Sequence, residues 1–232
     1  MTKSGVFISF EGGEGAGKST QVRRLLASME EKGIHCITTR EPGGSPGAED
    51  IRKLLVQGDI DRWEPVAETL LLFAARADHI ERTIKPALSS GTSVICDRFT
   101  DSTYAYQGVG RGVDRETIRR IETLSVGDFR PNLTFLLDID PKVGLERTTT
   151  RATPLFDPAM KDPDSTEAKA ALNRRKEARF ERFGKTFHER LRQAFLDIAK
   201  RSPDRCVIID ASQSEDAVAA AIWDAVARRF GL

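Results

Sequence analysis

The sequence has no apolar stretch that approaches the length of a membrane-spanning helix, so we expect no membrane partner. Its formal net charge is only +1, which gives no indication of binding to nucleic acid. The first apolar run begins within a few residues of Met1, so no signal peptide is expected. Cysteine is scarce too: Cys36, Cys96 and Cys206 are far apart and lie in or beside apolar runs. An odd number of such cysteines favours a reducing compartment, so we expect a cytoplasmic location.

The overall composition, with 39% hydrophobic and 31% charged residues, is typical of a soluble globular protein. A chain of 232 residues is long enough for one well-packed α/β domain and short for two. No internal repeat divides it. We therefore expect a single domain over residues 1–232.

Five short apolar runs are continuous rather than alternating, which is typical of strands in a parallel sheet buried on both faces. The predicted strands are Val6–Phe10, Ile34–Thr39, Ser93–Asp97, Leu133–Ile139 and Cys206–Asp210. Helical patterns separate them, first as far as Gly33 and then over about 47–57, 64–90, 114–127, 141–151, 173–201 and 214–230. The alternation predicts a doubly wound α/β fold, with helices on both faces of a five-stranded parallel sheet. Ligands of such sheets bind beyond the C-terminal ends of the strands.

Residues 12–19 match the P-loop pattern and stand between a predicted strand and a predicted helix, which is the context that the motif requires. Glycines allow successive N–H groups to curl around phosphate oxygens, and the helix N-terminus adds partial positive charge. Lys18 can reach the β- and γ-phosphates, and the Ser19 hydroxyl can bind Mg²⁺. The motif predicts binding of a nucleoside triphosphate through Gly12, Gly13, Glu14, Gly15, Ala16, Gly17, Lys18 and Ser19.

A P-loop alone does not separate kinases from GTPases, motors or recombinases. The sequence lacks the Asn-Lys-x-Asp tetrapeptide with which GTPases read guanine, and large motors usually have longer chains. Arginines near the predicted C-terminal strand ends, or on the helices that leave them, favour a phosphotransferase with an anionic second substrate, because the planar guanidinium suits phosphate recognition. These arginines are Arg40, Arg52, Arg76 and Arg98.

Four segments carry a family resemblance: Phe10-Glu11-Gly12-x-Glu14-Gly15-Ala16-Gly17-Lys18-Ser19, Thr39-Arg40-Glu41-Pro42-Gly43-Gly44, Asp97-Arg98-Phe99 and Ala105-Tyr106-Gln107-Gly108. Together they resemble the thymidylate kinase family, whose members move the γ-phosphoryl group of ATP onto dTMP to give dTDP. The resemblance covers about residues 5–212 and implies a nucleoside monophosphate kinase-like fold with a flexible lid over about 147–180. The P-loop has no arginine, which is similar to the bacterial type, in which lid arginines assist transfer.

The resemblance implies roles for residues at the phosphate end of the site. Glu14 is implied to meet the sugar 3′-hydroxyl of the monophosphate. Glu41 and Arg98 match positions that hold the acceptor phosphate, and Arg52 matches a further contact nearby. Lys18 and Arg98 are therefore the implied catalytic residues of this region.

The resemblance also implies a metal and a base site. Asp97, together with Ser19, is implied to organise Mg²⁺ and its waters. Arg76 matches the arginine that addresses the thymine edge, and Thr103 and Gln107 match its other polar partners. Thymine offers two carbonyl acceptors and one N–H donor, which an arginine and an amide or hydroxyl can satisfy.

Two departures from the family pattern leave alternatives open. The family has a base-stacking phenylalanine one helical turn before the arginine, where this chain has Leu72, with Phe73 one residue later. Either Phe73 binds the base through a shifted helix, or Leu72 packs on it less specifically, or Phe73 is an ordinary core residue.

The second departure lies in the lid. Arg147 and Arg151 match family lid positions, the first as an ATP contact and the second as a catalytic residue. The segment 152–171 is longer than usual and rich in Pro, Asp and Ala, so Arg179 is an alternative to Arg151. His188, further along, is predicted to be structural.

Two other functions remain open on the sequence. One is a kinase for a different nucleoside monophosphate or for a deoxynucleoside. The other is a regulatory P-loop module that holds ATP without turnover. Members of the family are homodimers, so a homodimer is expected by resemblance.

Overall fold

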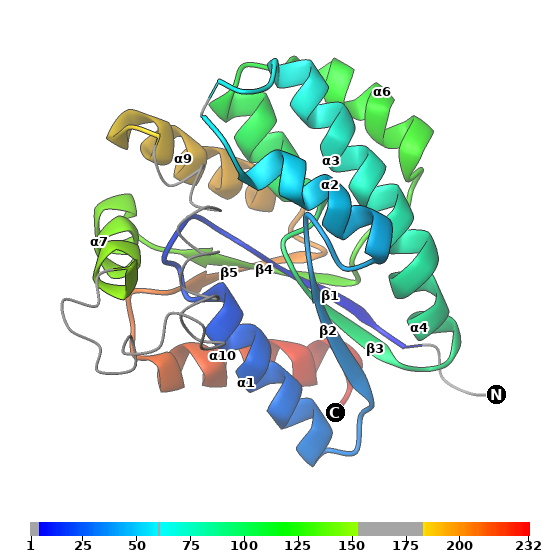
Figure 1. Cartoon of the computed structure of the whole chain (residues 1–232). Helices are drawn as coiled ribbons and strands as arrows, with labels where there is room; N and C mark the ends of the chain where they lie inside the picture. The colour runs from blue at the N-terminus through cyan, green and yellow to red at the C-terminus, as the bar shows by residue number, and fades with distance from the viewer. Residues whose placement is uncertain (1–4, 60, 153–182) are drawn as a thin grey trace, which may run out of the picture.

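The computed structural model describes residues 5–59, 61–152 and 183–232. Within them, five parallel strands form one sheet in the order β2-β3-β1-β4-β5 (Figure 1). The strands are β1 (Phe7–Glu11), β2 (Cys36–Arg40), β3 (Ser93–Asp97), β4 (Leu133–Asp138) and β5 (Cys206–Asp210). The predicted parallel sheet is confirmed, and the helices between the strands confirm the α/β class.

Helices connect the strands, with two π-helical segments among them. They are α1 (Lys18–Glu31), α2 (Pro46–Val56), α3 (Pro65–His79), η1 (Ile80–Ile84), α4 (Lys85–Ser89), α5 (Thr100–Thr103), η2 (Tyr104–Gly110), α6 (Arg115–Ser125), α7 (Pro141–Ala152), α9 (Lys185–Arg201) and α10 (Glu215–Phe230). The helix predicted over 64–90 is confirmed as α3, η1 and α4 in succession. No helix in the described ranges is long and apolar enough to cross a membrane.

Helices cover both faces of the sheet, as predicted (Figure 1). Helices α1 and α10 pack on one face, where Ile8 and Phe10 of β1 enter their apolar cluster. On the opposite face Phe7 packs against Ile80 and Ile84 of η1. Successive side chains of β1 thus enter opposite cores, and full burial of each contributes roughly 1.5–3 kcal/mol. Burial on both sides explains why the strand is a continuous apolar run.

Strands β1, β2 and β3 end together at one edge of the sheet. Phe10 is in register with Asp97, and Asp97 with Arg40. The segments that follow therefore begin side by side, namely the P-loop, the Glu41-Pro42-Gly43-Gly44 turn and the Arg98-Phe99 turn. The edge that parallel sheets use for ligands thus carries all three.

One predicted helix boundary is wrong, and one helical segment is absent from the sequence-based prediction. Gly184 has an extended backbone before α9, so the helix predicted over 173–201 does not pass through it; residues 173–182 lie outside the described ranges. Residues 100–110 form α5 and η2. The pattern does not predict these because the buried first turn, 100–103, is entirely polar and shows no apolar period.

Candidate active site

The P-loop begins at the end of β1 and is shaped by its glycines. Gly12, Gly15 and Gly17 have φ angles of 134°, 68° and 88°, where a side chain is strained. Gly17 caps α1 without a side-chain hydrogen bond, so no capping side chain occupies the first N–H groups of this helix. Such N–H groups, with the positive end of the helix dipole, form an anion site.

Lys18 folds back onto the P-loop. Its Nζ donates to the carbonyl oxygens of Gly12 and Gly13, at 3.1 and 2.8 Å. Burial, and then the positive charge of Arg98, lower the pKa of Lys18 to about 8. An anionic phosphate is a stronger acceptor than two carbonyls, so bound phosphate would draw the ammonium group from the loop and favour its charged form.

Ser19 and Asp97, the two predicted Mg²⁺ ligands, lie together. The Ser19 hydroxyl donates to Asp97 Oδ2 at 2.9 Å. Both are oxygen donors of the kind that Mg²⁺ prefers. The described residues hold no cluster of three or more His, Cys, Asp or Glu side chains that could bind a metal alone. The pair therefore fits an ion that takes most of its ligands from nucleotide phosphates and water.

Arg98 is the only non-glycine residue in the described ranges with φ in the left-handed region, at 72°. Its guanidinium donates to the Gly12 carbonyl and the Tyr106 hydroxyl, both at 2.9 Å, and to Ser102 Oγ at 3.1 Å. Burial opposes its charge, but Tyr106 and Glu14 raise the pKa of Arg98 above its usual value. A strained backbone costs about 1–3 kcal/mol and persists only where its surroundings hold it. These contacts place a permanent cation beside the P-loop.

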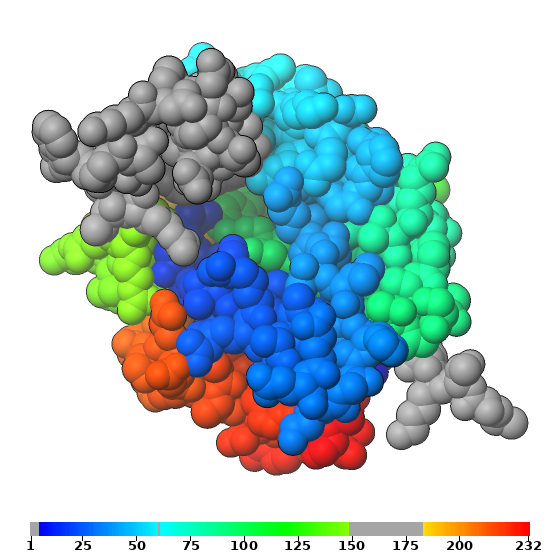
Figure 2. Space-filling view, turned by 60° about the horizontal axis from the view of Figure 1, so that its bottom comes forward, coloured from blue at the N-terminus to red at the C-terminus, as the bar shows by residue number. Residues whose placement is uncertain are grey.

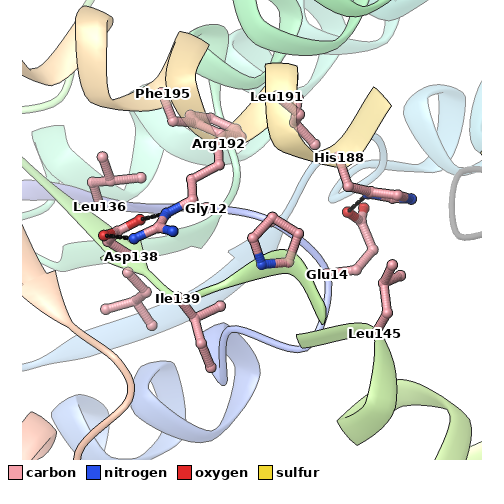
Figure 3. A pocket seen from close by; sticks show the side chains of 13 residues that line it. Gly12, Glu14, Leu136, Asp138, Ile139, Leu145, His188, Leu191, Arg192 and Phe195 are labelled. Atoms are coloured by element: carbon pink, nitrogen blue, oxygen red, sulfur yellow. Dashed lines mark hydrogen bonds and ion pairs between the residues drawn. The ribbon is translucent and has the colours of Figure 1, made fainter. Parts of the chain in front are cut away.

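Glu14 leaves the P-loop towards Arg98 and α9. Its Oε1 accepts from the Tyr106 hydroxyl and, at 3.3 Å, from Arg98. Its Oε2 lies 3.4 Å from His188 Nδ1 of α9 (Figure 3). Burial opposes ionisation, but His188, Arg98 and Lys18 outweigh it and lower the pKa of Glu14 to about 2. Glu14 is therefore an anionic acceptor at the edge of the phosphate cradle, and His188 supports it, in line with its predicted structural role.

A small pocket adjoins the P-loop on the side of α9 (Figure 3). Gly12 and Glu14 line it together with residues of β4, α7 and α9. On its wall Arg192 donates to both carboxylate oxygens of Asp138, at 2.7 and 2.8 Å. This bidentate pair ties α9 to the end of β4 and so supports the back of the P-loop.

A second cluster forms behind the turn after β2. Arg76 Nε donates to Glu41 Oε2 at 2.6 Å, and His79 Nδ1 lies 3.0 Å from Glu41 Oε1. All three side chains are almost fully buried. Both oxygens of Glu41 are thus engaged by Arg76 and His79. The resemblance implies that Glu41 holds the acceptor phosphate and that Arg76 contacts the base. The structure places these two side chains in direct contact.

Arg76 is fixed on several sides. Its Nη2 donates to Thr103 Oγ1 at 3.1 Å and to the Phe99 carbonyl at 3.3 Å. Its guanidinium lies over the rings of Phe73 and Phe99, at 4.8 and 5.3 Å from their centroids. Its buried Nη1 has no hydrogen-bond partner in the described part of the chain. This donor is available for an acceptor on a ligand.

The two candidates for stacking on the base lie in different clusters. Phe73 is 1% exposed and packs against Val113 and Ile118. Leu72 is 9% exposed and packs towards Leu55. The near-complete burial of Phe73 favours the interpretation that it is a core residue, one whose ring packs against the Arg76 guanidinium.

The remaining predicted site residues lie around this frame. Gln107 is buried and donates to Glu68 Oε1 at 2.9 Å. Arg52 Nη1 donates to the Pro42 carbonyl at 2.8 Å, and Arg147 of α7 donates to the Ala211 carbonyl at 3.3 Å. Figure 2 shows a recess beside the cyan surface, with dark blue surface of the N-terminal region and green surface in its depth.

The predicted catalytic lid arginine cannot be placed by its side chain. Arg151 belongs to the last turn of α7, but its side chain lies outside what the structure describes. Arg179 and the part of the predicted lid from 153 to 180 also lie outside the described residues.

Sequence reasoning alone missed several residues of this frame. Tyr106 lies within one of the four motifs, but its contact with Glu14 joins residues 92 positions apart. His79 follows Arg76 by three positions on α3, and this helical spacing is the signal that could have joined both to Glu41. Glu68 carries no such signal.

The known proteins that this chain resembles are thymidylate kinases. The family model for thymidylate kinase matches residues 10–164. The chain is 52% identical to the thymidylate kinase of Caulobacter vibrioides, over 98% of this chain and 99% of that protein. It is 48% identical to that of Dinoroseobacter shibae, over 95% of each. The crystal structure of thymidylate kinase from Ehrlichia chaffeensis superposes with a TM-score of 0.71 at 31% identity, covering 96% of this chain and 99% of that one. This chain belongs to the thymidylate kinase family.

Proposed function

We propose that the protein transfers the γ-phosphoryl group of ATP to dTMP and releases ADP and dTDP. One observation carries the proposal: three successive residues join the phosphate end of the site to the base end. Asp97 accepts from Ser19, Arg98 donates to the Gly12 carbonyl, and the Phe99 carbonyl accepts from Arg76. The turn formed by Asp97, Arg98 and Phe99 thus sets the distance between the P-loop, which would hold the triphosphate, and Arg76, which would contact the edge of the base.

The chemistry needs positioning and positive charge more than a covalent catalyst. The P-loop N–H groups and Lys18 would hold the ATP phosphates, and Arg98 would hold the phosphate of dTMP against them. Ser19 and Asp97 are suited to hold Mg²⁺, which when bound would offset part of the negative charge of the phosphates. Ionised Glu14 would accept a hydrogen bond from the 3′-hydroxyl of the sugar. The acceptor phosphate oxygen then attacks the γ-phosphorus, and ADP leaves in line.

The lid arginines are part of the proposal. The P-loop from Gly12 to Ser19 contains no arginine, so a further cation for the transferred phosphoryl group has to come from elsewhere. We assign that role to Arg151 and keep Arg179 as the alternative. Arg147, held beside Ala211 at the loop after β5, would contact ATP.

We also propose a cytoplasmic homodimer. All three cysteines are free thiols, which supports a reducing compartment. Leu54 of α2 and Val66 and Leu70 of α3 are 40%, 46% and 51% exposed, and their helices pack side by side. Apolar side chains gathered on one outer face are typical of an interface between protein chains.

A coupled assay for ADP formation tests the function. We expect turnover with dTMP well above that with dUMP, dCMP or dGMP, and none with thymidine, which has no phosphate for Arg98. A preference for another monophosphate would assign a different kinase. ATP binding without ADP formation on any acceptor would instead identify a regulatory module.

A further inference from the structure

Behind the predicted base-reading residue Gln107 lies a buried carboxylate to which the reaction assigns no role. Gln107 Nε2 donates to Glu68 Oε1 at 2.9 Å. Glu68 is 0% exposed and Gln107 is 2% exposed, so this contact is shielded from water. Glu68 lies in the first turn of α3, and Gln107 lies in η2. The bond therefore joins two separate elements at the base end of the site.

The bond determines which end of the Gln107 side chain can face a ligand. A carboxylate accepts hydrogen bonds and donates none, whereas a glutamine amide has one end that donates and one that accepts. If the amide turned over, its carbonyl oxygen would meet the Glu68 oxygen inside a buried site, where repulsion is strong and a lost hydrogen bond costly. Glu68 thus holds the Nε2 end and leaves Oε1 free to accept.

Arg76 is arranged in the same way. Glu41 holds its Nε and Thr103 its Nη2, while its buried Nη1 has no partner among the described residues. Thr103 and Gln107 lie one helical turn apart along α5 and η2. The base end of the site therefore presents a fixed donor from Arg76 and a fixed acceptor from Gln107.

This pair of groups distinguishes the two pyrimidines. Thymine carries a carbonyl at position 4 and an N–H at position 3, so it can accept from Arg76 and donate to Gln107 Oε1. Cytosine carries an amino group at position 4 and an unprotonated nitrogen at position 3, so both contacts would be mismatched. A site that leaves its own buried polar groups unpaired rejects the wrong base strongly.

We propose that Glu68 is a positioning residue for base choice, acting through Gln107 by fixing which end of its amide faces the base. The inference rests on the proposed use of dTMP. It concerns the preference between bases, not the transfer of phosphate.

Glu68→Gln tests the inference because it keeps the size of the side chain and removes its acceptor-only character. The amide that replaces the carboxylate could donate or accept, so the Gln107 amide could turn over and accommodate cytosine. We expect the ratio of kcat/KM for dTMP over that for dCMP to fall roughly tenfold to a hundredfold, the effect of one buried hydrogen bond to a charged group. The change should lie in the KM for the monophosphate, and the KM for ATP should stay unchanged.

Three controls separate this effect from general damage. Glu122→Gln changes another buried glutamate, one that accepts from the Tyr104 hydroxyl of η2 but lies behind no base-reading residue, and should leave the ratio unchanged. Glu68→Asp keeps the carboxylate and should retain the preference for dTMP. In a Gln107→Leu background, Glu68→Gln should have no further effect on the ratio.

The outcomes are distinct. A folded Glu68→Gln enzyme with the wild-type ratio would overturn the inference, and so would a loss of the preference in Glu68→Asp equal to that in Glu68→Gln. Thermal unfolding of each variant establishes that it is folded. If Glu68→Gln is not, Glu68→Met takes its place: it also removes the acceptor, so the same fall in the ratio is expected, and a folded Glu68→Met enzyme with the wild-type ratio would overturn the inference. Absence of dTMP turnover in the wild-type protein would instead refute the proposed function.

Discussion

Arg98 shows how much of this site is prepared before any ligand arrives. Its left-handed backbone is held by its own N–H, which donates to the Phe10 carbonyl, and by Cys96 Sγ, which donates to its carbonyl. Its guanidinium lies over the ring of Tyr106, 4.9 Å from the centroid. Its Nη groups already donate to Gly12, Ser102, Glu14 and Tyr106, so in the proposed complex the acceptor phosphate would replace some of these acceptors while the charge stays in place.

Arg98→Lys should weaken the use of dTMP even though the charge is kept. Lysine is a point donor and cannot reproduce a bidentate contact, while the backbone strain is the same for both residues. We expect a loss of about 1.5–3 kcal/mol in transition-state stabilisation, measured from kcat/KM for dTMP. An effect on ATP alone would show that Arg98 does not hold the acceptor phosphate.

Lys18 should make nucleotide binding dependent on pH. Its pKa is lowered to about 8 in the free protein, and a bound phosphate should raise it again. Below pH 8 Lys18 is already charged, so binding takes up no proton there; above pH 8 binding must protonate it, and affinity should fall as pH rises. Calorimetry at about pH 8.5 in two buffers of different ionisation enthalpy measures this proton uptake.

Glu11 is a second group that could take up a proton at this pH when nucleotide binds. Burial and the nearby Asp101 raise its pKa to about 8 as well. Glu11→Gln keeps an oxygen that can accept from the Phe99 N–H, places an NH2 donor opposite the Ser102 hydroxyl, which can accept from it, and removes the titration. Proton uptake that persists in Glu11→Gln belongs to Lys18, whereas uptake that disappears would assign the pH dependence to Glu11.

At the level of elements, α7 and the P-loop meet through two glycines. A Cβ on Gly144 would lie 2.3 Å from the Glu14 carbonyl oxygen, and one on Gly15 would lie 1.9 Å from the Gly144 carbonyl oxygen. Neither backbone can move easily to relieve such a contact. Gly144 follows β4, whose end is held by the Arg192–Asp138 pair, and Gly15 follows β1, which is paired with β4. The root of α7 is therefore coupled to the shape of the phosphate cradle.

Gly144→Ala tests this coupling because two effects oppose each other. Helix propensity predicts that alanine stabilises α7 by about 1 kcal/mol. The clash predicts instead a lower melting temperature and weaker ATP binding, and we expect it to prevail. Gly184→Ala, at the N-cap of α9, is the control for ATP affinity, since a Cβ there meets nothing within 4 Å. A Gly144→Ala protein as stable as wild type with normal ATP affinity would show that the contact is loose.

The sequence predicts some elements of the site better than others. The P-loop, the strands and the Ser19–Asp97 proximity follow from local patterns and from the rule that parallel strands end at one edge. Contacts of Glu14 with Tyr106 and of Glu68 with Gln107 do not, because they depend on how η2 and α3 pack. Tyr106 and Glu68 share no helical spacing with another polar site residue on their own element, unlike Arg76 and His79, so their partners cannot be inferred from positions along the chain.

The end of α7 carries the next prediction. If Arg151 stabilises the transferring phosphoryl group, Arg151→Ala should lower kcat with little change in the binding of ATP or dTMP. Single-turnover kinetics and equilibrium titration measure the two separately. Arg179→Ala is the paired variant: loss of activity there alone would move the role to Arg179. Full activity in both would exclude a lid arginine from the transfer step.

At the scale of the whole molecule, α2 and α3 carry three of the exposed large apolar side chains of the described residues. Val66 and Leu70 lie four positions apart on α3, so they share one face of that helix, and Leu54 stands on the neighbouring α2. On the inner side, Leu55 and Val56 of α2 already pack against α3. The exposed residues therefore do not serve the monomer core, and a second copy of the chain would bury them.

Leu70→Glu should convert the proposed dimer into a monomer, because it places a charge where apolar surfaces would meet and burying an unpaired charge is costly. Sedimentation velocity over a range of concentrations measures the change, and thermal unfolding checks that the monomer stays folded. Ile208→Glu on the edge strand β5 is the control, since Ile208 is 43% exposed and comparable in size but lies away from α2 and α3. If Leu70→Glu sediments like the wild type while Ile208→Glu dissociates, the interface lies at β5. If the wild type is itself a monomer at every concentration, the homodimer is wrong and this apolar face needs another partner.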